Sequence, residues 1–146
     1  MKDYQLVKAI NSIAIERLYP VIKELRPDLN FPDFMRHYQA ARAADGYELV
    51  MLVDGENKIL AVMGYRVLHD FVHGRHLYID DLVITESERS RGWGSKLLSH
   101  AEVIARELGC ANLRLCTGVE NDRGKTFYER NGWKLRAVAY KKQVAG

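Results

Sequence analysis

The sequence predicts an α/β (α+β) fold in which helices flank a mixed, mostly antiparallel sheet. Three observations predict it: a β-hairpin pattern in the middle of the chain, amphipathic helices on both sides of it, and a strand–turn–helix junction with two glycines. This order of elements is typical of helices packed on one sheet. The 146 residues contain no Pro- or Ser-rich linker, so we expect a single domain over 1–146.

The N-terminal third predicts one short strand and two helices. Tyr4–Lys8 fits a strand. Apolar residues then recur at helical spacing, at Ile15, Leu18, Ile22 and Leu25. Pro20 falls inside this run and lacks an amide hydrogen, so it should kink the helix or begin a second one. Another helix is expected after Pro32.

The middle of the chain predicts three strands. Tyr47–Val53 and Lys58–Leu68 are rich in β-formers, and the tight turn between them, Asp54–Asn57, makes this a hairpin signal. A polar loop, His69–Arg75, then leads into a third strand over His76–Thr85.

The C-terminal part alternates helices and strands. A periodic helix follows the glycine-bearing turn and is closed by Gly109. Leu113–Thr117 alternates as a half-buried strand should, and Asn121–Asn131 predicts a short helix closed by Gly132. Trp133–Lys142 is expected to supply one or two last strands.

Charge and hydropathy exclude several classes of protein. The formal net charge is only +3, and no run of like charges marks a nucleic-acid binder. No segment approaches the roughly 20 apolar residues needed to cross a bilayer. The N-terminus lacks a signal-peptide pattern, so a cytoplasmic location is expected. A mildly positive balance suits a small anionic ligand.

The junction from Leu82 to Lys96 carries the clearest chemical signal. Gly92 and Gly94 let the backbone turn sharply and expose its amides where a helix begins. The first amides of a helix have no internal partner, so with the helix dipole they favour a phosphate or pyrophosphate. Arg89 and Arg91 add positive charge. The alternative is that the glycines only make a tight connection; neither a dinucleotide fingerprint nor a P-loop is complete.

A second motif lies in the segment from Asn121 to Trp133. On a helix, Asn121, Gly124 and Tyr128 share one face. Gly124 is a poor helix former, which indicates a close approach of some group there. The alternative makes Asn121 an N-cap, Gly124 a packing accident and Tyr128 a core aromatic.

Together these two motifs resemble those of the GNAT N-acetyltransferase superfamily. Arg89-Ser90-Arg91-Gly92-Trp93-Gly94 is similar to its pyrophosphate loop, and Asn121-x-x-Gly124-x-x-Phe127-Tyr128-Glu129-x-x-Gly132-Trp133 is similar to its later motif. The resemblance implies a sheet splayed between the fourth and fifth strands, and acetyl-CoA as co-substrate. It implies an acyltransferase that moves the acetyl group directly to a primary amine.

The resemblance also implies roles for particular residues. Backbone groups of Leu82, Val83 and Ile84 would pair with the pantetheine arm, and the Ile84 amide would polarise the acetyl carbonyl. Asn121 and Gly124 would lie at the coenzyme, and Tyr128 would protonate the leaving thiolate. The pyrophosphate would be held by Arg89, Ser90, Arg91, Gly92, Trp93, Gly94 and Ser95.

The base that deprotonates the amine is left open. Asp80 and Asp81 lie in the strand before the splay point, and Asp80 shares strand parity with Leu82 and Ile84 unless a bulge reverses it. One aspartate could act as base; alternatively, one makes a structural hydrogen bond and the other attracts a cationic substrate. Water could also remove the proton.

No metal site is expected. His69, His73 and His76 bracket a polar loop that contains Asp70, but no ligand set with closed spacing is visible, so a solvated loop is predicted. The expected partners are acetyl-CoA and an amine acceptor, without nucleic acid or membrane, and a homodimer is left open. The acceptor is expected to be a small cationic molecule. A protein lysine or N-terminus, or a non-catalytic acetyl-CoA sensor, is the alternative.

Overall fold

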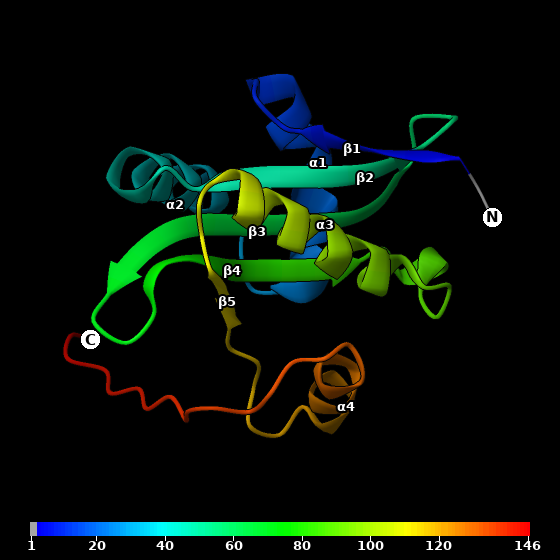
Figure 1. Cartoon of the computed structure of the whole chain (residues 1–146). Coiled ribbons are helices and arrows are strands. Elements are labelled where there is room, and N and C mark those ends of the chain that lie inside the picture. The colour runs from blue at the N-terminus through cyan, green and yellow to red at the C-terminus, as the bar shows by residue number, and fades with distance from the viewer. Residues whose placement is uncertain (1–2) are drawn as a thin grey trace. The chain divides into compact units, whose positions relative to one another are not determined.

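The computed structural model describes residues 3–146 (Figure 1). The chain divides into two compact units, the first ending at Arg114 and the second running over Leu115–Gly146. The expectation of one domain over 1–146 stays a prediction. The elements, in order, are β1 (Tyr4–Lys8), α1 (Ser12–Leu25), α2 (Phe31–Asp45), β2 (Glu48–Asp54), β3 (Ile59–Asp70), β4 (Gly74–Ile84), a 3-10 turn (Glu86–Glu88), α3 (Trp93–Glu107), β5 (Asn112–Leu115) and α4 (Asp122–Arg130).

The strands form one sheet in the order β1-β2-β3-β4-β5. β1 to β4 pair antiparallel with their neighbours, and β5 is parallel to β4. The mixed, mostly antiparallel α/β fold predicted from the sequence is therefore confirmed. The splay between the fourth and fifth strands stays a prediction.

The helices of the first unit bury both faces of the sheet. α1 and α3 each pack against β3 and β4, and Figure 1 shows α3 on the near face with α1 behind the strands. The core on the α1 side combines Ile15, Leu18 and Ile22 of α1 with Leu49 and Met51 of β2. Alternate β2 residues face the other layer. Both faces of the sheet are thus covered, which accounts for the continuous apolar runs of β2 and β3.

Asparagine side chains and a glycine cap the ends of α1 and α2. The Asn11 and Asn30 side chains cap α1 and α2 by accepting hydrogen bonds from helix amides, each at 2.9 Å. Gly46 ends α2 in the left-handed conformation. Pro20 lies within the single helix α1, so the second helix considered for that position does not form.

Two expectations from the sequence differ from the structure. The predicted loop 69–75 is mostly strand, because β3 and β4 continue to a tight hairpin in which Asp70 pairs with Gly74. No strand forms over the segment 133–142 in the described part of the chain, where Val138 and Tyr140 are largely exposed. A strand needs a partner to hydrogen-bond with, and local β propensity does not supply one.

No helix in residues 3–146 is both long and apolar enough to span a membrane.

Candidate active site

The glycine turn before α3 presents free backbone amides. Gly92 is the N-cap in the left-handed conformation, at φ 86°, and its helix has no side-chain cap. The first helical hydrogen bond in this turn is donated by the Lys96 amide to the Gly92 carbonyl, at 3.2 Å. Within residues 3–146, no protein group accepts from the amides of Trp93, Gly94 and Ser95. These three donors, at the positive end of a helix, suit a diphosphate.

The space in front of this turn is open. A Cβ added at Gly92 would meet no heavy atom within 4 Å. Ser90 also has a positive φ, 62°, a conformation that costs a residue with a Cβ free energy. Arg89 and Arg91 flank the turn with side chains that are more than half exposed. The loop residues predicted from the sequence therefore lie together, as a strained and positively charged turn.

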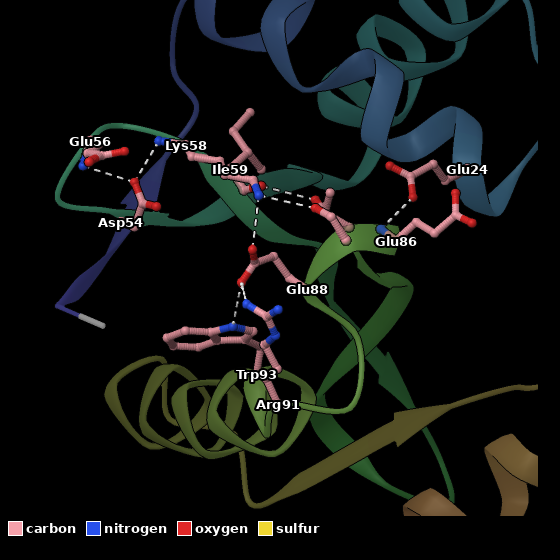
Figure 2. Close-up of polar contacts among 11 residues, drawn as sticks. Glu24, Asp54, Glu56, Lys58, Ile59, Glu86, Glu88, Arg91 and Trp93 are labelled. Carbon is pink, nitrogen blue, oxygen red and sulfur yellow. Dashed lines mark hydrogen bonds and ion pairs between the residues drawn. The ribbon is translucent and has the colours of Figure 1, made fainter. Parts of the chain in front are cut away.

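A buried glutamate that the sequence reasoning missed holds this turn (Figure 2). Glu88 is only 2% exposed. Its carboxylate accepts from the Lys58 ammonium at 2.9 Å, from the Trp93 indole N–H at 3.3 Å and from Arg91 at 3.4 Å. Because Lys58 and Arg91 carry two positive charges and Glu88 one negative charge, one net positive charge remains beside the amides of the glycine turn. Glu88 therefore fixes the turn to the start of β3.

A second carboxylate anchors the other side of the same segment. Glu24 of α1 accepts from the Glu86 amide at 2.8 Å (Figure 2). Glu24 also lies 3.6 Å from the Arg89 guanidinium. Arg89 also donates to the Ile84 carbonyl, at 3.2 Å. The end of β4 and the glycine turn are thus held by contacts to α1 and to each other.

Backbone amides at the end of β4 point alternately toward β3 and away from it. The Thr85 amide donates to the Leu60 carbonyl of β3 at 3.0 Å. Because neighbouring residues in an antiparallel pair alternate, the Ile84 and Leu82 amides face away from β3, whereas the Val83 amide faces it. Of the three predicted strand residues, Leu82 and Ile84 therefore present backbone groups to the β5 edge, and Val83 belongs to the β3 ladder.

A β-bulge places both predicted aspartates on one face of the sheet. Gly64 pairs with Asp81 and Tyr65 with Ile79, so Asp80 is the extra residue of β4. A bulge of this kind breaks the alternation of side chains. Asp80 consequently shares its face with Asp81, and it does not share the parity of Leu82 and Ile84.

Both aspartates are paired with arginines. Arg66 binds the Asp80 carboxylate through two nitrogens, at 2.7 and 3.0 Å, and also contacts Asp45 at 2.7 Å. Arg26 donates to Asp81 at 3.1 and 3.3 Å. Three carboxylates against two guanidiniums give the group a formal charge of −1. We call Arg26, Asp45, Tyr47, Arg66, Asp80 and Asp81 the aspartate cluster.

Tyr47 is the remaining member of the aspartate cluster. Its hydroxyl donates to Asp81 at 2.6 Å. Burial, with the negative charge of Asp81, raises the pKa of Tyr47 well above its ordinary value, so the phenol stays protonated and remains a donor. Gly64 makes room for it, since a Cβ at Gly64 would lie 1.8 Å from the Tyr47 hydroxyl oxygen. A glycine inside a strand is the sequence signal that could have revealed this approach.

Burial also perturbs Asp80. It raises the pKa of this carboxyl above its ordinary value, although the Arg66 guanidinium opposes the rise. A carboxylate whose pKa moves toward neutrality becomes a better proton acceptor. Both of its oxygens are engaged by Arg66, so accepting a proton requires that this pair loosen.

The second unit contains the other predicted residues, Asn121, Gly124 and Tyr128. Asn121 caps α4 by accepting from the Gly124 amide at 3.0 Å, and donates to the Thr117 hydroxyl at 2.9 Å. A Cβ at Gly124 would lie 2.3 Å from the Asn121 side-chain nitrogen. The group that approaches Gly124 in this structure is therefore the Asn121 cap itself. The coenzyme contacts expected of Asn121 and Gly124 stay predictions.

Tyr128 is half-buried against its neighbours in α4 and beyond. Its ring lies 5.1 Å from Phe127 and 5.9 Å from Trp133, centroid to centroid. Burial raises the pKa of the phenol, which favours the protonated form. No hydrogen bond to its hydroxyl is found in the described residues. A protonated phenol of this kind suits a proton donor.

Comparison with known proteins identifies the family to which this chain belongs. Residues 10–133 match the Acetyltransferase (GNAT) family, and the chain belongs to that family. It is 30% identical over 127 residues to the uncharacterized N-acetyltransferase YhdJ of Bacillus subtilis, covering 86% of this chain and 89% of that protein. The resemblance seen in the two sequence motifs is thereby confirmed.

Further relatives have named activities. The chain is 27% identical over 126 residues to a thialysine N-epsilon-acetyltransferase of Bos taurus, covering 77% of this chain and 74% of that protein. A solved structure of the aminoglycoside N-acetyltransferase AAC(6')-Iy with CoA superposes with a TM-score of 0.82 at 17% identity, over 99% of this chain and 97% of that one. This structural likeness shows the fold.

The chain is therefore an acyltransferase of the N-acetyltransferase class, with acetyl-CoA as its co-substrate. Its own residues fit that group. The amides of Trp93, Gly94 and Ser95 lack acceptors, and the Cβ position of Gly92 opens onto free space. The bound co-substrate supplies the activated acetyl thioester, and this turn would hold its diphosphate.

Proposed function

We propose that this acetyltransferase transfers the acetyl group directly to a primary amine of a small cationic molecule. The observation that supports the acceptor class is the net negative charge of the aspartate cluster. Its Asp80 and Asp81 lie on β4 immediately before the backbone edge of Leu82 and Ile84, and their side chains are only 19% and 18% exposed. A half-buried negative group attracts cations more strongly than an exposed one.

The relatives agree with this acceptor class. One acts on thialysine and another on aminoglycosides. Both kinds of molecule carry at least two amines, and each has a net positive charge at neutral pH. A cluster that holds an excess negative charge beside the transfer site would orient such a molecule with its reactive amine toward the thioester.

The chain supplies three functions for transfer. The Ile84 amide, on the edge away from β3, would donate to the acetyl oxygen as negative charge develops on it. Tyr128, whose pKa is raised by burial, would protonate the thiolate that leaves. The amine must first lose a proton, and we propose that the aspartate cluster takes it through Asp80 or through a water molecule that Asp80 orients.

The activity is tested by measuring thiol release from acetyl-CoA across a panel of polyamines, aminoglycosides, amino acids and lysine peptides. We expect turnover with polycationic small molecules, and loss of most of it in Tyr128→Phe. Turnover confined to peptides would instead identify a protein acetyltransferase. Tight CoA binding without thiol release from any amine would identify a non-catalytic sensor, and either result contradicts the proposal.

The acceptor class is tested with Asp80→Asn, which changes the cluster charge from −1 to 0. At a separation of about 8 Å and an effective dielectric constant of about 20, one charge contributes about 2 kcal/mol per acceptor charge. We therefore expect kcat/KM to fall at least about tenfold, and further for a dicationic than for a monocationic acceptor. The control is Glu56→Gln, the same charge change at an exposed turn. Equal losses for both variants would contradict the assignment.

A further inference from the structure

The β3–β4 hairpin gathers three side chains that carry metal-binding atoms. Asp70, His73 and His76 each offer one such atom, and the three atoms lie within 4.8 Å of one another. The sequence reasoning expected a solvated loop here. The hairpin instead pairs Asp70 with Gly74, which brings the aspartate against both imidazoles.

The Asp70 carboxylate is oriented by the backbone of its own turn. Its Oδ1 accepts from the Val72 amide at 3.0 Å and from the His73 amide at 2.6 Å. Its Oδ2 points to the histidines, 3.0 Å from His73 Nδ1 and 3.9 Å from His76 Nε2. Oδ1 is thus held by the loop, while Oδ2 faces the two imidazoles and is hydrogen-bonded to His73.

The His76 ring is oriented by a backbone hydrogen bond. It is fully buried, and its Nδ1 lies 2.9 Å from the Gly74 carbonyl oxygen. Because a carbonyl can only accept, Nδ1 carries a hydrogen, and Nε2, which accepts from the Arg114 Nε–H at 3.3 Å, is the nitrogen left to bind an ion. Metal-binding histidines are commonly fixed by a hydrogen bond of this kind from the ring nitrogen that does not bind the metal.

We propose that Asp70, His73 and His76 form a binding site for a divalent transition-metal ion of the zinc class. In a tetrahedral zinc site with bonds of about 2.0–2.1 Å, neighbouring ligand atoms lie about 3.3 Å apart. The two Asp70 Oδ2 separations here, 3.0 and 3.9 Å, lie on either side of that value. An ion would replace the proton of the hydrogen bond between His73 Nδ1 and Asp70 Oδ2, so binding releases that proton and needs a small rotation of the side chains.

The donor set selects the metal. Two imidazoles and one carboxylate suit zinc or cobalt, whereas magnesium and calcium prefer sites built from oxygen alone. Three protein ligands leave a fourth position for water. Asp70 is exposed at the hairpin, so an ion can enter from solvent.

Arg114 contacts the His76 nitrogen that an ion would bind. Its Nε lies 3.3 Å from His76 Nε2, and its guanidinium stacks 4.6 Å above the Tyr78 ring. Metal binding must displace this donor from the lone pair and place a cation near another cation. Replacing Arg114 by a neutral residue should therefore tighten binding.

The site is separate from the acetyl-transfer residues. His76 lies near the start of β4, and Ile84 ends it, eight residues later. At about 3.3 Å per residue, the two are about 26 Å apart. An ion here would close the β3–β4 hairpin, and its binding is measurable without any acetyl transfer.

The test is a titration of untagged, chelator-treated protein with Co²⁺, followed by competition with Zn²⁺. We expect one ion per chain, the visible absorption of four-coordinate cobalt, and no thiolate charge-transfer band from Cys110 or Cys116. His73→Gln and Asp70→Asn should each weaken binding by more than the about 10–100-fold that loss of an outer-shell partner costs. Asn at position 70 can still accept the two loop amides through its oxygen, so the hairpin should persist.

The matched control is His69→Gln, an exposed histidine next to the cluster, which should bind as the wild type does. Arg114→Gln should bind several-fold more tightly. Unchanged affinity in both His73→Gln and Asp70→Asn would overturn the proposal. A thiolate band, or loss of binding in His69→Gln, would also overturn it by placing the ion elsewhere.

Discussion

Gly64→Ala tests whether the aspartate cluster is built as the structure shows it. The new Cβ would lie 1.8 Å from the Tyr47 hydroxyl oxygen and 2.5 Å from Tyr47 Cζ. The ring must move, and its 2.6 Å hydrogen bond to Asp81 must break. Gly64 does not have a positive φ, so the backbone itself accepts alanine. The cost therefore comes from the contact with Tyr47.

The magnitude follows from three contributions. Overpacking a filled site costs about 2 kcal/mol, and losing a hydrogen bond to a charged group costs about 2 kcal/mol. Replacing glycine by alanine in a strand returns about 0.7 kcal/mol. We expect Gly64→Ala to lower the free energy of unfolding by about 3 kcal/mol. Urea denaturation followed by tryptophan fluorescence measures it.

Two further variants separate this reasoning from a general intolerance of mutation. Gly55→Ala is the matched control, because a Cβ at Gly55 meets nothing within 4 Å, and it should cost less than about 0.5 kcal/mol. In a Tyr47→Phe background the hydrogen bond is already absent, so Gly64→Ala should cost only about 1 kcal/mol. A cost below about 0.5 kcal/mol in the wild type, or an equal cost in both backgrounds, would refute the reasoning.

Three other predictions concern the turn and the proton donor. Glu88→Gln removes the charge that pairs with the partly exposed Lys58 and Arg91, so it should destabilise the protein by about 1–2 kcal/mol in urea denaturation. Glu86→Gln, at an exposed position, should not, and equal effects would contradict the role of Glu88. Gly92→Asp puts negative charge and a strained φ at the turn, so calorimetry should show loss of CoA binding. Gly92→Ala adds only the strain, which costs about 1 kcal/mol. Unchanged CoA affinity in Gly92→Asp would contradict the assignment of this turn as the diphosphate site. Burial raises the pKa of Tyr128 above its ordinary value, so the phenol keeps its proton as the pH rises. The rate constant kcat should therefore show no Tyr128-dependent fall below about pH 10. A fall in kcat near pH 8 that disappears in Tyr128→Phe would contradict the role of Tyr128 as proton donor.

Features that depend only on residues close together in the chain could be predicted from the sequence. The amphipathic stripe predicted α3, and the two glycines before it predicted a turn with exposed amides, because both depend only on neighbours in the chain. The Gly132 closure of α4 is equally local. The loop half of the candidate site could therefore be predicted.

Features that depend on distant residues could not be read in this way. Arg26 reaches Asp81 from 55 residues away, and Lys58 reaches Glu88 from 30 residues away. Nothing in the local sequence marks Glu88 as the buried anchor of the turn. The bulge at Asp80 also depends on how β3 and β4 pair, and that register decides which face the aspartate occupies.

The central claim is that the backbone amides of Trp93, Gly94 and Ser95 hold the diphosphate of CoA. Amide chemical shifts, followed by NMR during a CoA titration, test it most directly. The account predicts that these three amides show large downfield shifts that saturate with CoA, and that they shift little with pantetheine, which lacks the diphosphate. Saturable CoA binding with these three resonances unmoved would contradict it.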